Sequence, residues 1–176
     1  EYGLGKETKK KACMKCSVTC IQDFPTGKQE GTFLALVFEG NIFRVLVCTL
    51  SGGDIYTRYK NYTVPPEVKK GYSHMLFDYL ASSLASLIEE QNIGNMELSL
   101  GFIVNFPIWQ ERINKGVLLS WNKGIKVNGV VGKDVVRLLE EAIRKRGDIK
   151  VKVVAVMNEE TESIMACCWK NPTCRI

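Results

Sequence analysis

Three short runs of apolar residues follow one another between residues 32 and 63, and each run ends at a turn signal. The runs cover Thr32–Phe38, Phe43–Leu50 and Ile55–Thr63, and the connecting residues read EGNI and SGGD. Short connections that contain glycine are typical of hairpins between antiparallel strands. We therefore predict an antiparallel meander of three strands, which ends at Pro65 and Pro66.

The apolar spacing changes from strand to helix after residue 73. It predicts an amphipathic helix over about 73–91, with Ser73 as its N-cap and Gly94 as its stop. The same period returns over 133–146, where Gly147 is the expected stop, and a third helix is expected over 160–169. Residues 98–104 and 151–157 are almost wholly apolar, which predicts strands buried inside a sheet. Residues 105–127 offer turn signals and brief apolar pairs, so we expect loops with small strands there.

This order of elements predicts the fold class. Three meander strands are followed by helix, strand, helix, strand and helix. Such an order indicates an α/β fold with a five-stranded mixed sheet flanked by helices, the arrangement of the ribonuclease-H/actin-like ATPase folds, although other α+β folds share it. The 176 residues are 45% hydrophobic, enough for one domain with a core. We expect a single domain, with an N-terminal segment over 1–31 and a sheet-and-helix core over 32–176.

Charge and composition argue against several classes of protein. The net charge of +5 comes partly from basic runs without interleaved aromatic residues, so we expect no nucleic-acid partner. No apolar run approaches ~18 residues, and the first residues lack a signal-peptide pattern. We therefore expect no membrane segment and a cytoplasmic location. The seven cysteines are odd in number, which argues against a secreted disulfide framework. Cys13, Cys16 and Cys20 have a spacing that zinc could use, but no histidine is near them, and reduced thiols without metal are the better interpretation.

Polar residues follow three of the predicted strands, at 39–41, 105–107 and 158–160. In a sheet of this kind, ligands gather at the carboxyl ends of the strands. These segments are therefore either solvated turns or one convergent site. The glycine-containing turn at 39–41 is of a type that can cradle a phosphate, because its backbone N–H groups point at the ligand. The single histidine, His74, leaves no Ser/His/Asp or Cys/His constellation for nucleophilic catalysis.

Several segments of the chain are similar, in the same order, to segments of one enzyme family. They are GLGKET at 3–8, FLALVFEGNIFRVLV at 33–47, LFDYLASSLA at 76–85, NFP at 105–107, KGVLLSWNKG at 115–124, GVVGKDVVRLLEEAIRKRGD at 129–148, VVAVMNE at 153–159 and MACCWKNPTC at 165–174. The chain resembles the hexokinase/glucokinase family, closest to its animal type, over essentially its whole length. The resemblance implies the small N-terminal lobe of a two-lobed sugar kinase that closes over hexose and Mg-ATP. The large lobe is expected to be absent from this chain.

The resemblance implies that the turn after the first strand is a degenerate phosphate loop. We assign Glu39, Gly40, Asn41 and Arg44 to it. Val37 stands where the family has an aspartate, and it cannot hold a magnesium-bound water. Glu39 replaces a glycine and places a negative charge beside the phosphates, which costs about 3 kcal/mol per charge pair at ~5 Å. We therefore expect that binding of Mg-ATP, the cofactor that the resemblance implies, is lost, and we predict no structural metal.

The resemblance also implies a hexose site. Asn105, Asn122, Lys123 and Asn158 are its expected sugar-binding residues, with glucose as the expected weak ligand. Lys123 and Asn158 match the family, whereas Asn105 and Asn122 stand where it has a serine and a threonine.

Glu159 is the expected catalytic residue, because it replaces the aspartate that removes the proton from the 6-hydroxyl of the sugar. Its extra methylene moves the carboxylate by ~1 Å, enough to cost about two orders of magnitude in rate. Glu160 and Glu162 stand where the family has threonine and glycine. Neighbouring carboxylates should raise one another's pKa.

Two functions stay open. The chain is either a non-catalytic sugar-sensing or scaffolding module, or the small lobe of a divergent hexose kinase that is active only with a large lobe or another protein partner. The sequence argues against a third function, a nuclease of the ribonuclease-H type, because such an enzyme needs metal-binding carboxylates on the first strand, where Val37 stands. The altered phosphate loop and the altered base favour the non-catalytic module.

Overall fold

Five strands form one mixed sheet in the computed structural model, which describes residues 19–21, 23 and 25–171. The order across the sheet is β3-β2-β1-β4-β7, made of β1 (Gly31–Phe38), β2 (Ile42–Ser51), β3 (Asp54–Thr63), β4 (Leu98–Val104) and β7 (Val151–Met157). β1, β2 and β3 pair antiparallel, whereas β4 pairs parallel with both β1 and β7. The predicted meander and the predicted five-stranded mixed sheet are confirmed.

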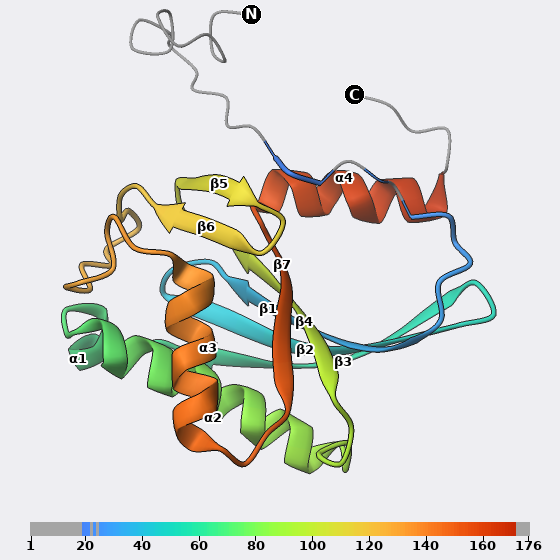
Figure 1. Cartoon of the computed structure of the whole chain (residues 1–176), viewed down its shortest axis with the longest axis horizontal. Helices are drawn as coiled ribbons and strands as arrows, with labels where there is room; N and C mark the ends of the chain where they lie inside the picture. The colour runs from blue at the N-terminus through green and yellow to red at the C-terminus, as the bar shows by residue number, and fades with distance from the viewer. Residues whose placement is uncertain (1–18, 22, 24, 172–176) are drawn as a thin grey trace, which may run out of the picture.

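Two long helices cover one face of this sheet. α2 (Ser73–Glu90) and α3 (Val135–Arg146) lie side by side (Figure 1), joined at their surface by an ion pair between Lys145 and Asp78. Below them, alternate residues of the strands are buried, because side chains alternate across a sheet. Leu36, Phe43 and Val45 are fully buried in this way. α4 (Glu159–Lys170) lies on the other side of the sheet, at the top of Figure 1.

The helix ends follow local chemistry that the sequence predicted only in part. Asp134 caps α3 by accepting a hydrogen bond from the backbone N–H of Val136, and Gly147 ends it in the left-handed conformation, as expected. The predicted bounds of α2, about 73–91, are confirmed to within one residue, but the two residues predicted to cap and stop it are wrong. Tyr72, not Ser73, is its N-cap, and no side chain caps that end. α2 stops at Glu90, before Gly94. The proline pair after β3 starts a further short helix, α1 (Pro66–Lys69), because proline suits the first helical position.

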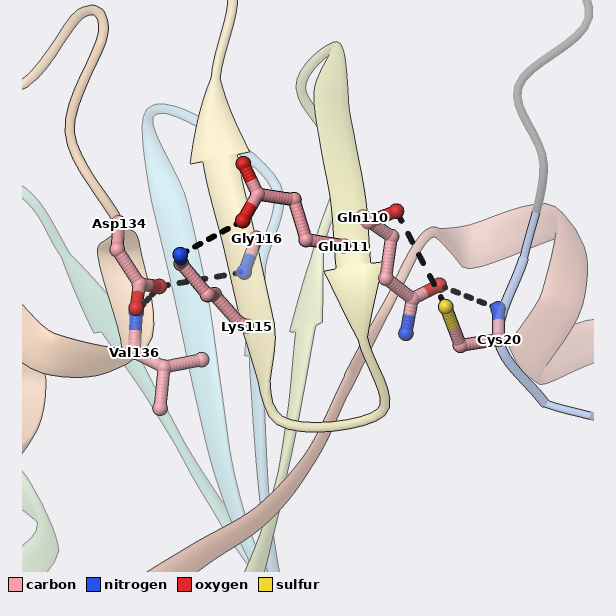
Figure 2. A network of polar contacts seen from close by, with 7 residues as sticks. All are labelled: Cys20, Gln110, Glu111, Lys115, Gly116, Asp134 and Val136. Atoms are coloured by element: carbon pink, nitrogen blue, oxygen red, sulfur yellow. Dashed lines mark hydrogen bonds and ion pairs between the residues drawn. The ribbon is translucent and has the colours of Figure 1, made fainter.

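The segment between β4 and α3 contains a hairpin of β5 (Ile108–Arg112) and β6 (Lys115–Leu118). Buried Gln110 fastens this hairpin to its surroundings (Figure 2). Its side-chain oxygen accepts from the backbone N–H of Cys20, as Figure 2 shows. Its side-chain amide donates to the carbonyl of Val156 on β7. On the other strand of the hairpin, the backbone N–H of Gly116 donates to the side chain of Asp134 at 3.2 Å. The expected small strands are therefore present and pinned from both sides.

Within the part of the chain that the structure describes, no helix combines the length and the apolar character needed to cross a membrane.

Candidate functional site at the carboxyl edge of the sheet

The segments that follow β1, β4 and β7 meet at one edge of the sheet. β1, β4 and β7 run parallel, so their carboxyl ends lie together. The backbone N–H of Asn105, directly after β4, donates to the carbonyl of Phe38 at the end of β1. Asn158 follows β7 and is the N-cap of α4. The turn at Gly40, Asn105 and Asn158 thus lie on the same edge, as the order of elements predicts.

Asn105 and Glu159 are in direct contact. The side-chain amide of Asn105 donates a hydrogen bond to the carboxylate of Glu159, the first residue of α4. Both residues are half-buried. The predicted sugar-binding asparagine and the predicted catalytic carboxylate therefore share one hydrogen bond, although 54 positions separate them along the chain.

Acidic side chains crowd the first turn of α4. Glu159, Glu160 and Glu162 all lie there, where the positive end of the helix dipole favours negative charge. Burial nevertheless raises the pKa of the Glu162 carboxyl above its ordinary value, and the charge of Glu159 raises it further. The expected mutual effect of these carboxylates is therefore present at Glu162, where desolvation is the larger cause.

Lys123 lies against the turn that follows β1. Gly40 is buried with a φ of +114°, and a Cβ built on it would stand 3.2 Å from the Cβ of Lys123. The ring of Phe106 lies on the same side of Gly40. Lys123 itself has a φ of +52°, a left-handed conformation that is uncommon for a residue with a side chain. The retained lysine and the retained glycine are therefore neighbours.

A backbone hydrogen bond closes the turn at 39–41. The backbone N–H of Glu39 donates to the carbonyl of Ile42 at 3.1 Å, and the carbonyl of Asn41 accepts from Val64. The side chains of Glu39 and Asn41 are exposed. The N–H of Glu39 is thus not directed at a ligand, as a phosphate cradle would require.

Arg44, which was assigned to the phosphate loop, and Val37, which stands where the family has an aspartate, both point elsewhere. The guanidinium of Arg44 donates to the side-chain oxygen of Asn61 at 2.8 Å and lies over the ring of Tyr59, so β3 holds it. Val37 lines an apolar groove between the sheet and α4. We call this groove, formed by strand residues that face away from α2 together with α4 and the segment before β1, the second-face groove.

Asn122 is the predicted sugar residue that the structure ties least to the others. Its side chain is exposed, and its backbone carbonyl accepts a hydrogen bond from the backbone N–H of Ile125 in the same loop. The preceding Trp121 anchors that loop. Its indole N–H donates to the carbonyl of Val127 at 2.8 Å, and its ring meets Phe106 edge-on with centroids 4.8 Å apart.

The aromatic group of Phe38, Phe106 and Trp121 is a feature of the site that sequence reasoning missed. It supports the Lys123 loop and the end of β1 at once. The signal was present in the sequence, because each of these aromatic residues stands next to a predicted site residue or turn. Only the packing shows that the three side chains touch one another.

The proposed zinc spacing is not tested by this geometry. Cys13 and Cys16 lie outside the described residues. Among the residues that are described, no cluster of histidine, cysteine or acidic side chains has the arrangement of a metal site.

Comparison with known proteins decides the family. The sequence profile of the family described as Hexokinase matches residues 1–169. This chain belongs to the hexokinase family. Hexokinase-1 of Rattus norvegicus is 36% identical over 179 aligned residues, and Hexokinase-2 of Homo sapiens is 37% identical over the same length. A solved hexokinase from Schistosoma mansoni, described as complexed with glucose, superposes with a TM-score of 0.91 at 34% identity.

The hexokinase relatives are longer than this chain. The alignments to the rat and human enzymes cover 100% of this chain and 20% of each relative. The Schistosoma match covers 98% of this chain and 39% of that protein. The chain thus spans about a fifth of the curated relatives and corresponds to a small-lobe domain of a hexokinase.

Proposed function

We propose that this chain is a non-catalytic hexokinase-family module that binds hexose weakly and serves as a sugar sensor or a scaffold. The observation that carries the proposal is the state of the turn after β1. Its Glu39 N–H is bonded within the turn, Glu39 brings a negative charge, and Val37 faces the second-face groove. The sugar residues at the edge of the sheet are altered less.

The residues at this edge do not fit Mg-ATP, the cofactor that the hexokinase family uses. Phosphoryl transfer depends on cations and donors that are positioned around the transferring phosphoryl group. Here Val37 offers no oxygen for magnesium-bound water, and Arg44 is held by Asn61 on β3. Lys123 lies beside Gly40, and a single lysine next to the acidic Glu39 would stabilise a bound triphosphate only weakly.

A neutral sugar meets a more favourable surface. Asn105, Asn158 and Lys123 offer hydrogen-bond donors and acceptors at one edge, and the carboxylate of Glu159 is a further acceptor. Hydrogen bonds contribute about 1 kcal/mol each, against an association cost of several kcal/mol, so a lone small lobe should bind glucose in the millimolar range or more weakly. Glucose is the sugar with which we would test binding, because the similar hexokinase from Schistosoma mansoni is described as complexed with it.

Tryptophan fluorescence tests the proposal. Trp121 directly precedes Asn122 and Lys123, so sugar at this edge should change its emission. The protein is titrated separately with glucose and with glycerol at equal osmolarity. We expect a saturable change in tryptophan emission with glucose alone. The variant Asn158→Ala should lose that change. Asn95→Ala, an exposed asparagine in the loop between α2 and β4 at the opposite edge, is the matched control and should keep it.

Equal and flat responses to glucose and glycerol would remove the sugar part of the proposal and leave a scaffold. A glucose response that survives in Asn158→Ala would place binding elsewhere.

The second candidate is an active small lobe that works with a large lobe. The observation in its favour is that Glu159 keeps a carboxylate at the start of α4, hydrogen-bonded to Asn105. In this reading residues 1–176 form one domain, and a large lobe supplies the groups that the phosphate turn lacks. Addition of a large lobe from a relative, followed by an assay of glucose phosphorylation, distinguishes the two candidates.

A further inference from the structure

β3 forms an open edge of the central sheet. It is the terminal strand in the order β3-β2-β1-β4-β7, so β2 is its only neighbour among the described strands. Every residue from 54 to 61 is exposed, and the turn of the β2–β3 hairpin projects beyond α2 (Figure 1). The other edge strand, β7, is protected, because its Val156 donates a backbone hydrogen bond to Ile113 in the turn of the β5–β6 hairpin. β3 is thus the edge at which another strand can pair.

Most of the devices that protect an edge strand are missing from β3. Natural edge strands are blunted by prolines, by bulges or by charged side chains. β3 contains no proline, and its register with β2 runs from Asp54 to Thr63 without a shift, so it has no bulge. It is also rich in tyrosine and threonine, which favour strands. Its two cations, Arg58 and Lys60, are the exception, and any strand that pairs here must accommodate them.

The backbone of β3 presents alternate residues to a new strand. Gly52 and Gly53 have φ values of +61° and +87°, which a two-residue hairpin turn of this kind requires. The turn joins Ser51 to Asp54, and its hydrogen bond directs the backbone of Asp54 toward β2. Hydrogen-bonded and non-hydrogen-bonded positions alternate along an antiparallel pair. The residues whose N–H and C=O groups point away from β2 are therefore Ile55, Thr57, Tyr59, Asn61 and Thr63.

One antiparallel register makes β3 complementary to a second copy of itself. When Thr57 stands opposite Thr57 of the second copy, Ile55 stands opposite Tyr59, and all three direct their backbone groups at the new strand. Ile55 and Tyr59 are 44% and 59% exposed in the single chain, so this pairing covers two apolar side chains per copy. Thr–Thr pairs and pairs of an aromatic with a β-branched residue are among the cross-strand contacts that stabilise sheets.

The same register compensates the charges of β3. Asp54 stands opposite Lys60 of the second copy, and Arg58 stands opposite Tyr56, whose ring attracts a cation. These residues occupy the non-hydrogen-bonded positions, where side chains come closest. Lys60 already pairs with Glu90 at 3.1 Å, but an ammonium group has three donors and can also bond Asp54 of the second copy. A register centred on Arg58 would instead place two guanidinium groups opposite each other, which destabilises a sheet.

We propose that this chain forms a symmetric dimer by antiparallel pairing of β3 with β3 of a second copy, centred on Thr57. The two sheets then form one continuous sheet across a two-fold axis. This inference goes beyond the proposed function, because it uses neither the carboxyl edge of the sheet nor sugar binding. Pairing over residues 54–60 covers a small area, so the dimer should dissociate roughly in the micromolar range.

Sedimentation velocity of the full 176-residue chain tests the dimer. The dimer fraction should rise as the protein concentration increases from about 1 to about 500 µM. Thr57→Pro removes an N–H that points away from β2 and should weaken the dimer about tenfold or more, because two symmetry-related hydrogen bonds are lost. Thr63→Pro, also at an outward position but outside 54–60, is the matched control and should dimerise like the unsubstituted chain. Circular dichroism confirms that both variants are folded.

Cysteine cross-linking tests the register without a proline. In Thr57→Cys the two new thiols lie opposite each other, with Cα atoms about 5.5 Å apart, a separation that a disulfide spans. In Tyr59→Cys each thiol faces Ile55 of the second copy, so the two thiols are about 13 Å apart along the strands. With copper phenanthroline as oxidant, Thr57→Cys should give a dimer linked through position 57, identified by mass spectrometry, and Tyr59→Cys should give none linked through position 59.

Three results would overturn the proposal. The first is an unsubstituted chain that stays monomeric over the whole concentration range. The second is a folded Thr57→Pro variant that dimerises as tightly as the unsubstituted chain. The third is cross-linking through position 59 that equals cross-linking through position 57, which would show that the two strands do not pair in this register.

Discussion

The side-chain amide of Asn105, at the end of β4, is hydrogen-bonded to the carboxylate of Glu159, at the start of α4. This contact joins two strand ends that the hexokinase resemblance assigns to sugar binding and to proton removal. It also orients the side chain of Glu159, whose carboxyl oxygen accepts the hydrogen bond from the amide. A neutral donor at position 105 is therefore part of what holds the edge together.

Replacement of Asn105 by aspartate should destabilise the chain. The variant exchanges a donor for a second carboxylate beside Glu159, so a hydrogen bond is lost and a like-charge contact appears. We expect a loss of about 1–2 kcal/mol in the free energy of unfolding at pH 7, measured by urea denaturation. The double variant Asn105→Asp with Glu159→Gln should recover most of it. A double variant as unstable as Asn105→Asp alone would show that the two side chains do not interact.

Replacement of Gly40 by alanine should disturb the turn that carries the phosphate-loop residues. A φ of +114° is open almost only to glycine, and the new Cβ would stand 3.2 Å from the Cβ of Lys123. We expect a cost of about 2–3 kcal/mol. Gly52→Ala is the control, since its φ is +61° and no described atom lies within 4 Å of the added Cβ. It should cost only about 1–2 kcal/mol. Equal costs in thermal and urea unfolding would contradict the crowding by Lys123.

The chain by itself should not phosphorylate glucose with Mg-ATP above background. The charge of the transition state would meet Glu39 and no adequate set of cations. The double variant Val37→Asp with Glu39→Gly should stay inactive, because the groups of a large lobe are still needed. A coupled assay with an active hexokinase as positive control measures both proteins. Turnover that disappears in Glu159→Ala would show that the small lobe is catalytic.

Glu162→Gln should stabilise the chain at neutral pH. The folded pKa of Glu162 is raised above its ordinary value of 4.5, first by burial and then by Glu159. The folded state therefore holds this proton more tightly than the unfolded state, and ionisation favours unfolding. The penalty is absent below pH 4.5, grows as pH rises to the folded pKa, and is complete above it.

Compared with the unsubstituted chain, Glu162→Gln should thus have a Tm about 1–2 °C higher at pH 7 and the same Tm at pH 3.5. This size is typical of a substitution near the surface. Glu160→Gln, exposed in the same helical turn, controls for the loss of a charge near the helix dipole. A gain that is equal at both pH values would contradict the linkage.

The candidate site was predictable from the sequence in its residues but only partly in its contacts. The order of the elements placed Gly40, Asn105 and Asn158 at one edge, because parallel strands end together. The motifs assigned Lys123 and Glu159 to the same site. The sequence offered no signal that Arg44 is held by Asn61, or that Glu39 closes its own turn.

The sequence by itself determined the elements, the mixed sheet and the family of this chain. The period of apolar residues is a local property, set by side chains that alternate along strands and recur every three to four positions along helices. Only the tertiary structure decided which distant residues meet: Asn105 with Glu159, Lys123 with Gly40, and the side chain of Gln110 with the backbone of Cys20 and Val156. It also placed Val37 in the second-face groove. Such contacts join residues far apart in the chain, and they depend on how whole layers pack rather than on any local spacing.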